Sequence, residues 1–125
     1  MWSPNPDLVK TIEQAQLLRV IVGENDRHGG IPLYEAIVLK AREAGLAGAT
    51  VVRACMGFGA SSHMHTTKVL RLSIDLPMVI EIVDRPEKIA ALLPFLDETV
   101  HGGLVTLEDV RAIHYRGTLG SGGKA

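Results

Sequence analysis

The sequence predicts an α+β fold in which four strands and two helices follow one another in the order β-α-β-β-α-β. Four runs rich in β-branched and other apolar residues predict the strands: residues 17–23, 49–59, 69–84 and 104–116. Two runs repeat apolar residues at helical spacing and predict the helices: residues 33–45 and 84–100. This order is the ferredoxin-like arrangement, an antiparallel sheet that carries both helices on one face.

The first half of the chain predicts a strand, a loop and a helix. The run "LLRVIVG" at residues 17–23 predicts a strand, and the polar residues 24–32, with a glycine pair, predict a loop. The following helix has its apolar residues on one side: Leu33, Ala36, Ile37, Ala41 and Ala44. Gly45 then ends the helix, because glycine readily adopts the left-handed conformation of a helix stop.

The second half predicts two strands, a helix and a last strand. The third strand is interrupted near residues 75–77 and is strongest at "MVIEIV". In the second helix, Asp84 and Glu87 have the spacing of a capping box, and Pro86 suits the first turn. Pro94 should bend this helix, because proline removes one backbone hydrogen bond. The apolar face of the helix consists of Ile89, Leu92, Leu93 and Leu96.

The third strand is apolar on both faces. Successive side chains of a strand point to opposite sides, so Met78, Ile80 and Ile82 share one face while Val79 and Val83 share the other. Two helices on one side of the sheet can cover only one of these faces. We therefore expect a closed homo-oligomer, in which another copy of the chain covers the second face.

Length and composition indicate one folded domain of residues 15–116, between an N-terminal arm of residues 1–14 and a flexible, glycine-rich tail of residues 117–125. The net charge of −1 argues against a protein that binds nucleic acid through its phosphate backbone. The single cysteine, Cys55, fits a reducing compartment and is interpreted as a buried structural thiol. With no secretory signal and no membrane-spanning run, a cytoplasmic location is expected.

The segment "MGFGASSHMHTT", residues 56–67, allows several interpretations. His63 and His65 alternate along an extended chain, so both could bind one metal ion, although no spacing links them to a third ligand. A nucleophilic Ser61 or Ser62 with a neighbouring histidine is less favoured, because no acidic residue is placed to orient the base. A short loop between two strands remains a further alternative.

Two glycine-rich stretches could approach a ligand closely. Gly57, Phe58 and Gly59 follow the second strand, where glycine permits either a β-bulge or close contact with a ligand. The stretch "HGG" at residues 101–103 offers unhindered backbone N–H groups, which attract phosphate. These stretches need not meet within one subunit, but they can meet across an oligomer interface.

Three stretches carry a resemblance to a known family: "GLAGATVVRACMGFG", "LSIDLPMVIEIVD" and "GLVTLEDV". Over residues 17–116 the sequence resembles the family known as domain of unknown function 190, a branch of the PII-like signalling superfamily. The resemblance implies a compact homotrimer of ferredoxin-like subunits, with adenine-nucleotide sites between subunits. It also implies a mobile loop between strands two and three that docks on a protein partner, such as a membrane transporter or an enzyme.

The resemblance places the nucleotide site on two segments, with the serine hydroxyls as added donors: Gly57, Phe58, Gly59, Ser61, Ser62, Gly102, Gly103, Leu104 and Thr106. The sequence departs from PII itself, because its loop is far shorter and lacks the modified tyrosine, and its phosphate loop is reduced to "HGGLVT".

The expected function is therefore that of a non-catalytic regulatory protein that needs no cofactor and binds ATP, ADP or AMP. The alternative is a metal-binding or hydrolytic protein that uses His63 and His65. Valine in place of Gly103 is expected to block the phosphate without unfolding the core.

Overall fold

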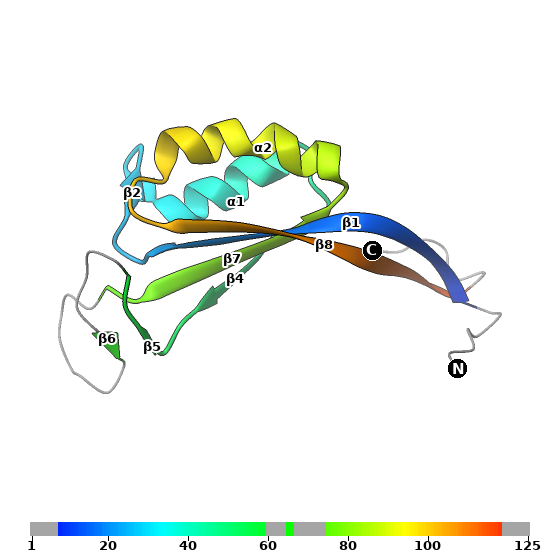
Figure 1. Cartoon of the computed structure of the whole chain (residues 1–125), viewed down its shortest axis with the longest axis horizontal. Helices are drawn as coiled ribbons and strands as arrows, with labels where there is room; N and C mark the ends of the chain where they lie inside the picture. The colour runs from blue at the N-terminus through cyan, green and yellow to red at the C-terminus, as the bar shows by residue number, and fades with distance from the viewer. Residues whose placement is uncertain (1–7, 60–64, 67–74, 119–125) are drawn as a thin grey trace.

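A four-stranded antiparallel sheet with two helices on one face forms the body of the chain (Figure 1). The computed structural model describes residues 8–59, 65–66 and 75–118. The strand order is β4-β7-β1-β8. The four strands are β1 (Leu8–Gly23), β4 (Thr50–Arg53), β7 (Pro77–Asp84) and β8 (Leu104–Thr118), and the helices are α1 (Leu33–Glu43) and α2 (Pro86–Thr99). The α+β fold with two helices on one face is confirmed.

The hydrophobic core lies between the helices and one face of the sheet. Along β1 and β7, alternate side chains point to the helices and are 5% exposed or less: Leu18, Val20, Val22, Met78, Ile80 and Ile82. The helices contribute Ile37, Ile89 and Leu92, none of which has any exposed surface. The helical spacing of apolar residues therefore predicted the buried faces of both helices, except that Ala44 is the exposed C-cap of α1.

The opposite face of the sheet has no helix over it (Figure 1), and we call it the open face. On β1 it carries Leu17, Arg19 and Ile21, which alternate with the buried residues. Residues directly opposite in an antiparallel pair share a face, so Val79 and Val83 of β7, which pair with Ile21 and Leu17, lie on the open face as well. The two-sided apolar character expected for the third strand is thus present in the fold.

Strands β1 and β8 are longer than the sequence predicts. They continue past the helical layer as a two-stranded ribbon, in which Ile12 pairs with Ile113 (Figure 1). Residues 8–14 of the expected arm and residues 117–118 of the expected tail therefore belong to strands. The apolar pattern did not reveal this extension, because no helix covers the ribbon and its apolar pair Ile12 and Ile113 remains 51% and 41% exposed.

The capping box expected at the start of α2 is wrong. The helix begins at Pro86, with Arg85 as its N-cap and no capping bond from a side chain, and it continues through Pro94. Asp84 ends β7 instead, and its carboxylate accepts hydrogen bonds from the backbone N–H groups of Ala47 at 2.9 Å and Arg85 at 2.7 Å. The hydrogen bond from Ala47 to the Asp84 carboxylate thus joins the loop before β4 to the end of β7.

Two short hairpins accompany the sheet. In the expected loop 24–32, β2 (Arg27–His28) pairs with β3 (Ile31–Pro32) around Gly29 and Gly30, both of which have positive φ. The expected second strand, 49–59, is divided into β4 and β5 (Met56–Gly57), and β5 pairs with β6 (His65–Thr66). The expected third strand begins as β7 at Pro77, and residues 67–74 lie outside the described residues. Among the described helices, none has the length and apolar character needed to cross a membrane.

Candidate functional site

The glycine segment after β4 forms the base of a short hairpin. Gly57 pairs with His65, and Gly59 follows two residues later. A Cβ atom on Gly57 would lie 2.9 Å from Cγ of Pro77, so the absence of a side chain lets β5 pack against the first residue of β7. Phe58, by contrast, is 65% exposed. Gly57 therefore has a packing role, while Phe58 is available to contact a ligand or a protein.

The second glycine segment connects α2 to β8. A Cβ atom on Gly103 would collide with the backbone carbonyl oxygen of Ile21 and would lie 2.9 Å from Cγ1 of Val100. Gly102 is different, because a Cβ atom there would meet no atom within 4 Å. The expectation that valine at Gly103 would leave the core intact is therefore wrong, since the backbone of β1 occupies the space. Gly102 is the glycine of this loop that has room for a side chain.

Both glycine segments lie at the same end of the sheet, but at opposite edges. Pro77 at the start of β7 pairs with Gly23 at the end of β1, and Leu104 at the start of β8 pairs with Ile21 (Figure 1). The Gly57 segment follows β4 at one edge, and the Gly103 segment precedes β8 at the other. Three strand spacings of about 4.8 Å separate these edges by roughly 14 Å. The structure therefore does not bring the two segments together within one chain.

Leu104 and Thr106 extend the second segment along the open face. Leu104 pairs with Ile21 and Thr106 with Arg19, and both β1 residues lie on that face. Leu104 is 56% exposed, so an apolar side chain stands beside the unhindered loop at the edge of the sheet. The four expected residues of this segment, Gly102 to Leu104 and Thr106, thus form one continuous strip.

The structure describes only part of the remaining expected site. Ser61, Ser62 and His63 lie outside the described residues, and His65 is described only through its strand pairing. Within residues 8–59, 65–66 and 75–118, no group of three His, Cys, Asp or Glu side chains is placed to hold a metal ion. Cys55 is a free, exposed thiol, so its interpretation as a buried residue is wrong. It lies in the short connection between β4 and β5, which the helices do not cover.

Carboxylates that the sequence analysis did not single out hold the end of β1. Asp75 accepts a hydrogen bond from the N–H group of Asn25 at 2.8 Å, and Asp26 accepts one from Gly23 at 2.9 Å. Glu24 forms an ion pair with Arg53 of β4 at 3.0 Å. In the sequence, Glu24 and Asp26 lie in a polar cluster after a strand and Asp75 lies where the third run is interrupted. Neither position distinguishes an anchoring role from an ordinary loop.

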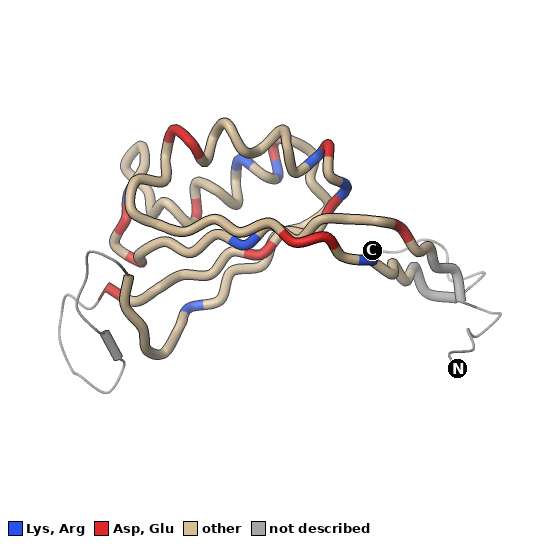
Figure 2. Tube along the Cα trace, in the orientation of Figure 1, with Lys and Arg blue, Asp and Glu red and all other residues tan. Residues whose placement is uncertain are grey.

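Charged residues of both signs are interspersed along the described trace, without a large block of either sign (Figure 2). At the end of the sheet that carries the glycine segments, Arg53 is already paired with Glu24, and Nη2 of Arg27 donates a hydrogen bond to the carbonyl oxygen of Gly30 at 2.8 Å. Among the described residues at this end, a phosphate would therefore meet mainly backbone N–H groups.

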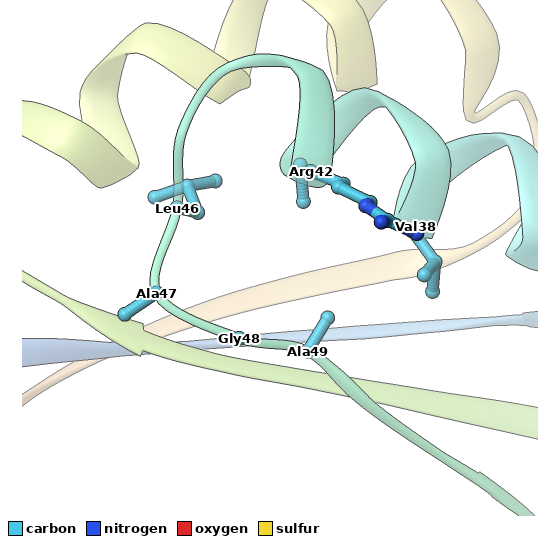
Figure 3. Close-up of a pocket in the computed structure, with 7 residues that line it drawn as sticks. Val38, Arg42, Leu46, Ala47, Gly48 and Ala49 are labelled. Atoms are coloured by element: carbon cyan, nitrogen blue, oxygen red, sulfur yellow. The ribbon is translucent and has the colours of Figure 1, made fainter. Parts of the chain in front are cut away.

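A hollow of about 280 Å³ lies at the opposite end of β4, between α1 and the connection to β4 (Figure 3). Its lining consists of Val38, Ala41, Arg42, Leu46, Ala47, Gly48 and Ala49. A second hollow of about 430 Å³ shares residues 47–49 and opens toward Glu81 and Val83. Neither hollow includes a site residue expected from the sequence.

Comparison with known proteins identifies the family. The model of the family DUF190, described as "Uncharacterized ACR", matches residues 15–112. The chain belongs to this family. A UPF0166 protein of Aquifex aeolicus is 40% identical to this DUF190 chain over 105 residues, which cover 82% of the chain and 97% of that relative. A UPF0166 protein of Methanocaldococcus jannaschii is 33% identical over 97 residues, covering 77% and 89%.

Solved structures place the DUF190 chain in the PII-like fold. CPII of Thiomonas intermedia, a nitrogen regulatory PII-like protein solved with ADP, AMP and bicarbonate, matches with a TM-score of 0.60 and 21% identity, covering 82% of this chain and 91% of CPII. A PII-like signalling protein of Thermus thermophilus matches with a TM-score of 0.58 and 15% identity, covering 81% and 91%. The resemblance to DUF190 and to PII-like proteins seen in the sequence is confirmed at the level of family and fold.

Proposed function

We propose that this DUF190 chain is a non-catalytic regulatory protein of the PII type, which assembles as a homotrimer and binds an adenine nucleotide between subunits. One observation carries the proposal: the segments of Gly57 and Gly103 lie at the same end of the sheet but at opposite edges. In a closed ring of subunits, the β4 edge of one copy approaches the β8 edge of the next. Each interface would then contain both halves of one site.

The chemistry of the two segments suits a nucleotide. Backbone N–H groups around Gly102 are unhindered and would face the phosphates, with the hydroxyl groups of Ser61, Ser62 and Thr106 as further donors. Phe58 and Leu104 are both more than half exposed and would cover the apolar faces of the adenine ring. CPII of Thiomonas intermedia, with the same fold, was solved with ADP and AMP bound, which supports ATP, ADP or AMP as the ligand class.

The binding should be of moderate strength. Arg27 and Arg53, the described arginines at this end of the sheet, already have partners within the chain, so neither is freely available for the phosphates. Micromolar dissociation constants correspond to a binding free energy of about −8 kcal/mol.

The loop that follows Phe58 would carry the signal to a cytoplasmic protein partner, such as a membrane transporter. Met56 and Phe58 are 55% and 65% exposed at the base of this loop, and their exposed apolar surface suits a protein contact. A nucleotide bound beside Gly57 and Gly59 would touch the same base. Ligand binding and partner binding would therefore be coupled through this hairpin.

Isothermal titration calorimetry with ATP, ADP, AMP and cyclic AMP tests the nucleotide site. The informative variant is Gly102→Val, because a side chain there meets no atom of its own chain but would fill the cleft between subunits. The matched control is Gly48→Val, since Gly48 has equally open surroundings at the other end of β4. We expect the wild type and Gly48→Val to bind with similar affinity and Gly102→Val to bind at least about tenfold more weakly.

Two results would contradict the proposal. If none of the four nucleotides at millimolar concentration produces heat or raises the melting temperature of the wild type, no nucleotide site is present, because a ligand that binds the native state must stabilise it. If Gly48→Val weakens binding as much as Gly102→Val, the site does not lie where we propose.

A further inference from the structure

A row of four polar side chains crosses the middle of the open face. Thr50 of β4 pairs with Glu81 of β7, Glu81 pairs with Arg19 of β1, and Arg19 pairs with Thr106 of β8. Because directly paired residues share a face, all four lie on the side of the sheet away from the helices. Each of the four strands therefore contributes one residue to this row, which exists only once the sheet has formed.

The two central members of this row form an ion pair that leaves bonding groups unused. Nε and Nη2 of Arg19 both contact Oε2 of Glu81 at 2.8 Å. Within the described part of the chain, Glu81 Oε1 and Arg19 Nη1 make no hydrogen bond to another side chain. The two side chains are 36% and 39% exposed, so these unused groups are open to contact from outside the chain.

Apolar residues flank the ion pair on both sides. The neighbouring row toward the glycine segments runs across all four strands and consists of Val52, Val79, Ile21 and Leu104. On the other side, Leu17 pairs with Val83 of β7 and with Glu108 of β8. Val52 and Leu104 are 53% and 56% exposed although their strands belong to the main sheet. The ion pair thus stands between rows that are apolar except for Glu108 at the β8 edge.

We propose that a second copy of this chain covers the open face and that Arg19 of one subunit pairs with Glu81 of the next. The inference rests on the homotrimer proposed above and names the contact that specifies it. The polar row carries one acid and one base side by side, so a rotated copy presents the opposite charge to each. A different protein would have to supply both charges at the same spacing, whereas a second copy does so through symmetry alone.

The unused groups account for the specificity of this contact. Removing an ion pair from water is costly unless its remaining donors and acceptors find partners. In a threefold ring, Nη1 of each Arg19 can donate to Oε1 of the neighbouring Glu81, so that three bases and three acids alternate around the axis. The apolar rows alone would permit one subunit to slide along the other, whereas the charged row fixes a single alignment of the two faces.

Charge-reversed variants test whether the pairing crosses subunits. Arg19→Glu leaves two acids in the row and Glu81→Arg leaves two bases, so each variant alone should assemble at least about 100-fold more weakly than the wild type. An equimolar mixture of the two, refolded together from denaturant, should regain assemblies that contain both chains. Two of the three contacts in such a ring are between unlike chains, and in both of them positions 19 and 81 carry opposite charges. Native mass spectrometry distinguishes these mixed assemblies from single chains of 13.5 kDa.

The control is Lys40→Glu, which reverses the charge of an ion pair with Glu43 on α1, in the helical layer. It should assemble like the wild type. Recovery in the double variant Arg19→Glu/Glu81→Arg but not in the mixture would overturn the proposal, because the pair would then act only within one chain. Full assembly of both single variants would overturn it as well. If a single variant fails to fold alone, the co-refolded mixture still decides between these outcomes.

The test separates this inference from the proposed nucleotide site. A wild type that assembles and loses assembly on charge reversal, yet binds no nucleotide, would support the charged interface and end the nucleotide proposal. A wild type that is a single chain at micromolar concentration would overturn the interface directly.

Discussion

The contrast between Gly103 and Gly102 allows a quantitative test of how tightly α2 is joined to β8. In the Gly103→Ala variant, the new methyl group would collide with the carbonyl oxygen of Ile21 and lie 2.9 Å from Val100 Cγ1 and 3.1 Å from Val22 Cγ1. The carbonyl oxygen cannot easily withdraw, because Ile21 pairs with Leu104 on one side and with Val79 on the other.

The expected loss of stability follows from two opposing effects. Inserting a methyl group into such close packing costs about 1–3 kcal/mol. Replacing glycine by alanine also restricts the unfolded chain, which offsets about 0.4–1 kcal/mol of this loss. We therefore expect Gly103→Ala to lower the free energy of unfolding by about 1–2 kcal/mol. For a chain of 125 residues, this corresponds to a melting temperature lower by roughly 4–8 °C.

Thermal denaturation followed by circular dichroism, at one fixed chain concentration, measures this difference. The matched control is Gly102→Ala, which meets no atom within 4 Å and should melt within about 2 °C of the wild type or slightly above it. If Gly103→Ala is as stable as Gly102→Ala, the backbone of β1 can yield at Ile21. The close approach would then not explain why glycine stands at position 103.

Two further predictions concern the core and the limits of the folded unit. Leu92→Ala removes a fully buried side chain and should cost about 2–5 kcal/mol in urea denaturation, whereas Leu39→Ala, at a side chain that is 51% exposed on α1, should change stability by less than about 0.5 kcal/mol. Equal losses would mean that the helix faces are wrongly assigned. A shortened chain of residues 15–116 should still melt cooperatively, because every buried apolar side chain that the structure describes lies between Ala15 and Leu96. A gradual melt would show that the ribbon of β1 and β8 supports the core.

Local patterns in the sequence were sufficient for the element order and for the buried faces. The helical repeat of Ile89, Leu92 and Leu96 and the alternation of Met78 and Ile80 each depend on neighbours within one element, so they can be read without knowing the fold. The family resemblance added the PII-like character, which the match to DUF190 and the solved PII-like structures bear out.

Contacts between distant residues could not be read in this way. Asp84 has the spacing of a helix cap, yet its carboxylate binds the loop at Ala47, which is 37 residues away. Gly102 and Gly103 look alike in the sequence, but only Gly103 lies against the carbonyl oxygen of Ile21. Whether a glycine is needed for packing or is free to face a ligand depends on which strand lies beside it.

The placement of the candidate site was also decided by tertiary structure. The sequence by itself determined which residues could approach a phosphate, because glycine can be identified there and has no side chain to shield its backbone N–H group. It did not determine that Gly57 and Gly103 lie at one end of the sheet and at opposite edges, nor that Arg19 and Glu81 meet across 62 residues on the open face. The register between paired strands decides these neighbours, and register arises only when the whole sheet forms.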